Sequence, residues 1–76
     1  MKIAEQHIYL MFDIQNSLAQ KIGEVKIRIH KHTDMEKWEN PELVKQEAID
    51  YFKSEYQDWK NSNIQAYYIG DLIPFL

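Results

Sequence analysis

The clearest pattern in the chain is an alternation of apolar and polar residues over residues 24–32. In a strand, successive side chains point to opposite faces, so Val25, Ile27 and Ile29 share one side. The side chains between them, on the other side, are Lys26, Arg28, His30 and His32. The pattern predicts a strand with one buried face and one solvated, basic face.

A helical pattern covers residues 41–60. Asn40 is a favourable N-cap residue, and Pro41 fits the first helical position. The apolar side chains that share a face at helical spacing are Val44, Ala48, Ile49, Tyr51, Phe52, Tyr56 and Trp59. The opposite face carries Glu47, Asp50 and Asp58. We therefore expect an amphipathic helix with an acidic outer face.

The first segment fits two interpretations. Projected at about 100° per residue, residues 3–22 place most of their apolar side chains on one side, and Gly23 suits a helix end. A long helix is therefore the leading interpretation. A strand over residues 8–14 competes with it, because the apolar residues there also alternate. These residues are Ile8, Leu10, Phe12 and Ile14.

The closing segment predicts a hairpin. Residues 63–69 alternate as a strand does, and Gly70 with Asp71 has the composition of a tight type II′ turn. Residues 72–75 would return antiparallel, and Pro74 confines them to a sheet edge because it has no N–H to donate. The outer face of this hairpin would carry Tyr67, Ile69, Leu72 and Pro74. That face is more apolar than contact with water favours.

Together these elements predict one α+β domain over residues 1–76, in two layers. The order is helix, strand, helix, strand, strand, and it ends in the C-terminal β-hairpin. The alternative makes residues 8–14 a first strand and gives the order strand, strand, helix, strand, strand. In both versions the helix over residues 41–60 crosses over between the strands at 24–32 and 63–69.

The composition of the chain bears on the size of its core and on its cellular location. A domain of 76 residues buries a small core, which five Tyr, three Phe and two Trp help to fill, and oligomerisation is a further route to stability. The chain has no cysteine, so we expect a reducing, cytoplasmic location. The N-terminal segment does not read as a signal peptide, and no stretch is long and apolar enough for a membrane span.

Motifs for catalysis are missing from the sequence. There is no nucleophile elbow, glycine-rich phosphate loop or paired-carboxylate signature, so we expect no enzyme and no cofactor. His30 and His32 place two imidazoles on one strand face. A metal needs further ligands, and because the spacing selects none, we expect no metal site.

The leading functional hypothesis is a protein-binding module whose partner is another protein or a second copy of the chain. It would resemble in kind the small inhibitors and adaptors of phages and mobile elements. The outer hairpin face would bind, and the acidic residues Glu47, Asp50 and Asp58 would steer a basic partner. The alternative is a nucleic-acid-binding accessory protein that uses Lys26, Arg28 and His30, although the sequence pI of about 5.5 is low for that class.

Overall fold

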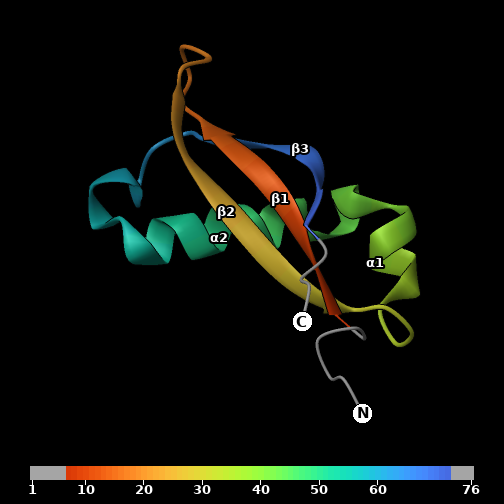
Figure 1. Cartoon of the computed structure of the whole chain (residues 1–76). Helices are drawn as coiled ribbons and strands as arrows, with labels where there is room; N and C mark the ends of the chain where they lie inside the picture. The colour runs from red at the N-terminus through yellow and green to blue at the C-terminus, as the bar shows by residue number, and fades with distance from the viewer. Residues whose placement is uncertain (1–6, 73–76) are drawn as a thin grey trace.

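The computed structural model describes residues 7–72 as a three-stranded antiparallel sheet with α2 packed across one face (Figure 1). The strands are β1 (His7–Gln15), β2 (Lys21–His30) and β3 (Gln65–Leu72), and β1 lies between the other two. The helical segments are α1 (Met35–Glu39), η2 (Pro41–Val44), α2 (Lys45–Glu55) and η3 (Gln57–Trp59). The α+β class is confirmed, whereas the predicted element order is not.

The leading prediction for the first segment, a helix over residues 3–22, is wrong, and its alternative, a strand over residues 8–14, is confirmed as part of β1. Residues 3–6 lie outside the described part of the chain. Ile8, Leu10, Phe12 and Ile14 are fully buried, so every second residue of this central strand enters the core. The helix is excluded because the chain turns at Asn16, whose Oδ1 accepts the backbone N–H groups of Leu18 and Gln20 at 2.9 and 3.0 Å.

β2 confirms the predicted inward and outward faces. Val25, Ile27 and Ile29 are buried, and Lys26 and Arg28 are exposed. The strand starts earlier than predicted, at Lys21, and ends at His30. Gly23 therefore lies inside a strand and does not end a helix, and His32 lies in the turn that follows.

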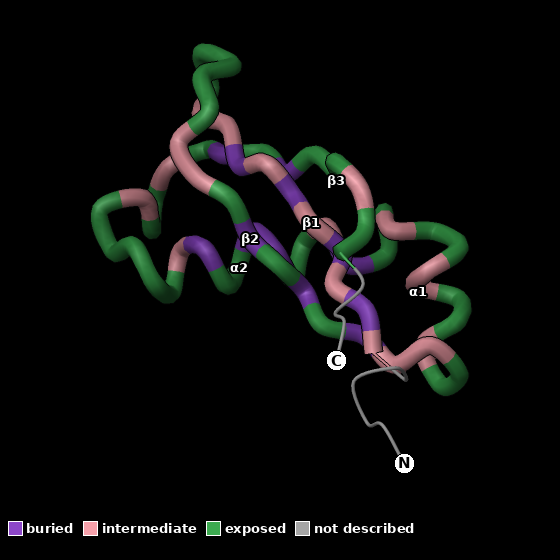
Figure 2. Tube along the Cα trace, viewed as in Figure 1, coloured by how far each residue is buried: buried purple, intermediate pink, exposed green. Residues whose placement is uncertain are grey.

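The predicted helix over residues 41–60 is split into η2, α2 and η3. Its core face is confirmed for Val44, Ala48, Ile49 and Phe52, which belong to the buried core cluster. Figure 2 shows buried positions on α2 and on the strands that it crosses. Tyr51 and Tyr56 were predicted on that face but are 52% and 56% exposed. Tyr51 lies beside the buried stripe of α2, and Tyr56 follows the end of the helix at Glu55. Asn40 precedes the helical segment as predicted, without a side-chain capping hydrogen bond.

The predicted turn at Gly70 and Asp71 is wrong, because both residues belong to β3. Met11 pairs with Gly70 and Leu10 with Asp71, and the register shifts between Met11 and Phe12. Ile69 is therefore the extra residue of a β-bulge, and Gly70 adopts φ 135°, a conformation that glycine tolerates. The glycine serves a bulge instead of a turn. Leu72, predicted to begin the return strand, continues β3, and residues 73–75 of that strand, Pro74 included, lie outside the described residues.

β2 and β3 both run antiparallel to β1, so they are parallel to each other with β1 between them. The connection through α2 joins these two outer strands, as the crossover prediction requires. As a result, α2 contacts all three strands and covers only one face of the sheet. The position of α2 leaves the second sheet face without a covering helix among residues 7–72.

Candidate interaction surface

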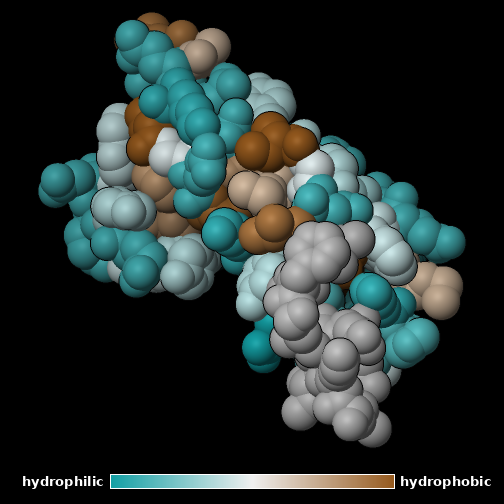
Figure 3. Space-filling model, viewed as in Figure 1, coloured by the Kyte–Doolittle hydropathy of each residue, from teal (hydrophilic) through white to brown (hydrophobic). Residues whose placement is uncertain are grey.

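The sheet face opposite α2 is here called the open face (Figure 1). It comprises the outward side chains Tyr9, Met11 and Asp13 of β1, Glu24, Lys26 and Arg28 of β2, and Tyr67, Ile69 and Leu72 of β3. Tyr67, Ile69 and Leu72 are 45%, 48% and 41% exposed. Apolar side chains also gather near the middle of the face turned to the viewer in Figure 3. A sheet face that meets water is normally polar, so this one is unusually apolar.

Strand register arranges the open face in three rows. One row runs from Arg28 through Tyr9 to Leu72. The next runs from Lys26 through Met11 to Gly70, and the third from Glu24 through Asp13 to Tyr67. In β2, positive charge therefore extends from the row of Arg28 into the middle row at Lys26, and negative charge lies in the third row. Apolar side chains lie at Met11 and along β3.

The negative end is organised by Lys21. Its Nζ lies 2.6 Å from Glu24 Oε2 and 3.3 Å from Asp13 Oδ1. The hydrogen bond between Lys21 and Glu24 raises the pKa of Lys21 and lowers the pKa of Glu24, because each charged form is stabilised by the other. One lysine thus serves two carboxylates, and the row keeps a net negative charge.

The positive end has no such counter-charge. Arg28 has no ion pair or hydrogen bond with any residue in the range 7–72, and Lys26 has no carboxylate within 4.0 Å in that range. An unpaired arginine in the same row as a tyrosine ring presents five N–H donors to whatever meets this face.

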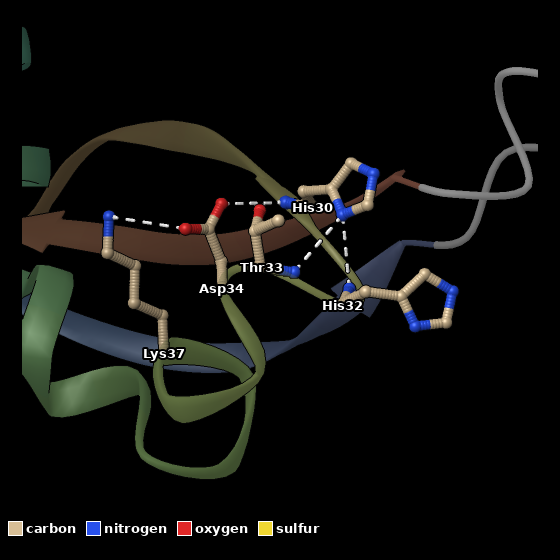
Figure 4. Close-up of polar contacts among 5 residues, drawn as sticks. All are labelled: His30, His32, Thr33, Asp34 and Lys37. Atoms are coloured by element: carbon tan, nitrogen blue, oxygen red, sulfur yellow. Dashed lines mark hydrogen bonds and ion pairs between the residues drawn. The ribbon is translucent and has the colours of Figure 1, made fainter.

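His30, the third residue of the predicted basic set, has a different role (Figure 4). Its ring Nδ1 accepts the backbone N–H groups of His32 at 3.1 Å and Thr33 at 3.3 Å. Its own backbone N–H donates to Asp34 Oδ2 at 2.9 Å. These hydrogen bonds hold the His30 ring within the turn that follows β2. His30 therefore organises the turn before α1, and only Lys26 and Arg28 form the basic part of the open face.

No group of three or more potential ligands within residues 7–72 could hold a metal ion. The rings of His7, His30 and His32 do lie near one another, with centroids 5.1 Å apart for His7 and His30 and 5.7 Å apart for His30 and His32. The rings of His7 and His30 meet edge to face, and the His30 ring also accepts the backbone N–H of His32.

The acidic part of the predicted partner surface lies elsewhere. Glu47 and Asp50 are exposed on α2, and Asp58 is exposed on η3. Glu47 and Asp50 are carried by a helix on the other side of the sheet from Ile69 and Leu72. Only at Tyr67 does a described side chain of α2 reach the strand edge, where Lys45 Nζ lies 5.5 Å from the centroid of the ring. The structure thus divides the predicted partner surface between two sides of the domain, and Pro74 lies outside the described residues.

Sequence reasoning missed Tyr9 and Met11, which form the centre of the open face. The signal was present in the alternation over residues 8–14. Ile8, Leu10 and Phe12 fix one face of that strand, and Tyr9 and Met11 follow on the other. The helix interpretation had mixed these two sets.

A shallow groove of about 360 Å³ lies between the edge of β2 and the C-terminal part of α2. It is lined by Glu24, Val25, Lys26, Tyr51, Phe52, Glu55 and Tyr56. Its volume reaches the lower end of the range for small-molecule sites. The groove holds two carboxylates and two tyrosines, but no serine, cysteine or histidine lines it. It therefore contains no Ser–His or Cys–His pair.

Asp71, the acidic residue of β3, accepts hydrogen bonds from two side chains of the domain. Trp38 Nε1 of α1 donates to Asp71 Oδ2 at 2.9 Å, and the Tyr68 hydroxyl donates to Asp71 Oδ1. Burial raises the pKa of Tyr68 to about 12, and the hydrogen bond and charge of Asp71 add to the shift. These contacts connect α1 to β3, and both carboxylate oxygens of Asp71 accept hydrogen bonds within the domain.

Comparisons with protein-family models, with curated proteins and with solved structures find no match to this chain. Within residues 7–72, none of the helices has the length and apolar character needed to span a membrane. Functional inference therefore depends on the geometry of the open face.

Proposed function

We propose that this chain is a small, non-enzymatic protein-binding domain that acts through its open face. The observation that supports the proposal is the combination of exposed Tyr67, Ile69 and Leu72 with Tyr9 and Met11 on a sheet face that no described helix covers. Aromatic residues, methionine and arginine are the residue types enriched in protein interfaces. The open face contains all three.

The proposed mode of action is that of an inhibitor or adaptor, which works by covering a surface of its partner. The groove beside β2 is open, and no serine, cysteine or histidine lines it, which favours binding over catalysis. Glu47 and Asp50 are exposed on α2, which lies on the other side of the sheet, and Asp58 is exposed on η3. These carboxylates would steer a basic partner at long range without joining the contact. The absence of cysteine suits a reducing, cytoplasmic setting.

A matched pair of substitutions tests the proposal. Leu72→Asp places a charge on the open face, whereas Leu43→Asp makes the same change on η2, where Leu43 is 52% exposed. Both variants are purified from the cells that produce the chain, with thermal unfolding as a check on folding. We expect the wild type and Leu43→Asp to retain a protein in defined stoichiometry and Leu72→Asp to lose it. Equal recovery with all three would contradict the proposal.

Nucleic-acid binding is a second candidate, favoured by the row that places unpaired Arg28 beside Tyr9. Cations for phosphates and rings for bases are the parts that single-strand binders combine. Binding of this kind would weaken steeply with added salt, whereas apolar docking would persist. If the double variant Lys26→Glu, Arg28→Glu leaves every measured interaction intact, this candidate is eliminated.

A further inference from the structure

We propose that the occupant of the open face is a second copy of this chain, packed sheet against sheet about a two-fold axis that crosses the strands at Met11. The inference rests on the proposed function, because it requires the open face to be a protein-binding surface. It adds the partner and the contacts.

Charge complementarity supports this pairing. Arg28 lies two residues to one side of Lys26 in β2, and Glu24 lies two residues to the other side. A two-fold axis along the row of Met11 and Lys26 exchanges the two ends of the face, so Arg28 meets Glu24 of the second copy. Arg28, which has no counter-charge within residues 7–72, gains one, and the symmetry forms the pair twice.

The apolar residues are also self-complementary about this axis. Met11 lies on the axis and faces Met11 of the second copy. Leu72 stands in the row of Arg28 and Tyr67 in the row of Glu24, so each faces the other across the interface. Stacked sheets pack about 10 Å apart with strands rotated by about 30°, and long side chains accommodate that rotation. The result is a four-layer assembly with α2 of each copy outside.

The same two-fold axis also creates an unfavourable contact at Lys26. Lys26 is in the row of Met11, so the two Lys26 side chains approach each other. The aliphatic stem lets each ammonium group turn away toward solvent, but some repulsion stays. Removing this charge should therefore strengthen the pairing.

An acidic protein segment or a nucleic acid would use the face differently. Either would contact Arg28 and Lys26 together and would leave Glu24 and Asp13 facing negative charge. The two-fold pairing uses both ends of the face. For these other occupants, loss of Lys26 would weaken binding, so the sign of one substitution separates the alternatives.

The first experiment is sedimentation equilibrium of the purified chain over a range of concentrations up to about 1 mM, where even a dissociation constant of that order is visible. We expect a monomer–dimer equilibrium in the wild type. Arg28→Glu and Glu24→Arg should each weaken it about tenfold, because the interface contains each pair twice. The double variant that carries both substitutions should restore it. Failure of the double variant to restore association would overturn the proposed axis.

Two further variants complete the test. Lys26→Leu should tighten the dimer several-fold, and a weaker dimer would contradict the proposal. Leu72→Asp should give a folded monomer, and Leu43→Asp should dimerise as the wild type does. Because Glu24→Arg also removes a partner of Lys21, its thermal unfolding is compared with that of Lys26→Leu, which keeps this pair.

The outcomes separate this inference from the proposed function. If the wild type stays monomeric at every concentration while Leu72→Asp still loses a different co-purified protein, the second-copy inference fails and the proposed function stands. If Leu72→Asp changes neither self-association nor co-purification, both fail.

Discussion

The Phe52 ring of α2 packs directly on the backbone of Gly23 in β2. A Cβ atom at position 23 would lie 2.6 Å from Cε1 and 3.3 Å from Cζ of that ring. Phe52 is 2% exposed, so its ring has little room to withdraw. The missing side chain at Gly23 is what lets α2 approach the sheet this closely.

Gly23→Ala should therefore lower the free energy of unfolding by about 1–3 kcal/mol, the usual cost of overpacking a core. The gain that alanine normally brings over glycine inside a strand, about 0.5–1 kcal/mol, reduces this cost. Urea unfolding of Gly23→Ala measures the net loss of stability. A double-mutant cycle with Phe52→Leu tests whether the ring contact causes that loss. If Gly23→Ala costs as much in the Phe52→Leu background as in the wild type, the ring contact is not the reason.

How far the sequence predicts the fold is shown by the two glycines. Alternation alone predicted β2 and its faces, because a half-buried strand imposes period two directly. Gly23 and Gly70 were interpreted through local chemistry, as a helix end and a turn. Their actual roles, a close approach to Phe52 and a bulge opposite Met11, depend on residues far away in the chain. No local pattern carries that information.

The same reason explains the partial success with the candidate surface. The sequence placed Tyr67, Ile69 and Leu72 on the outer face of a hairpin and left open whether the first helix covers it. They are exposed, although the hairpin itself does not form. The split between these residues and the acids of α2 could not be predicted, because it depends on which sheet face the helix covers. Tyr9 and Met11 were missed because the central strand, apolar on one face and mixed on the other, also fits a helical projection.

Ala19, in the turn between β1 and β2, adopts φ 62°, a left-handed conformation that costs a residue with a Cβ about 1–2 kcal/mol. Ala19→Gly should relieve most of this strain and raise the free energy of unfolding by about 0.5–1 kcal/mol after the greater chain entropy of glycine is subtracted. The hydrogen bond from the Ala19 N–H to Asn16 O, at 3.0 Å, stays available in the variant.

Ser17→Gly is the matched control for that substitution, since Ser17 is exposed in the same turn and does not have positive φ. It should leave stability unchanged or lower it. Thermal and urea unfolding of both variants provide the comparison. A gain for Ser17→Gly equal to that for Ala19→Gly would show that the turn gains from flexibility in general and not from relief at Ala19.

The contact between Tyr68 and Asp71 should make the stability of the domain depend on alkaline pH. Burial and the Asp71 carboxylate favour the neutral phenol, so the pKa of Tyr68 rises from 10.0 to about 12 in the folded state. A raised folded-state pKa gives stability that is fully present below about pH 10 and is lost as the pH rises toward 12. The phenol then loses its proton, and a phenolate faces a carboxylate.

Phenolate absorbance should accordingly show a late component from Tyr68, and that component should be absent in Tyr68→Phe. Asp71→Asn should bring the titration earlier without restoring the ordinary value, because burial is the larger cause. Tyr67→Phe, a change at the neighbouring ring, controls for loss of any tyrosine. If wild type and Tyr68→Phe lose stability equally between pH 10 and 12, other groups such as lysines account for the alkaline transition, and the coupling of Tyr68 to folding is refuted.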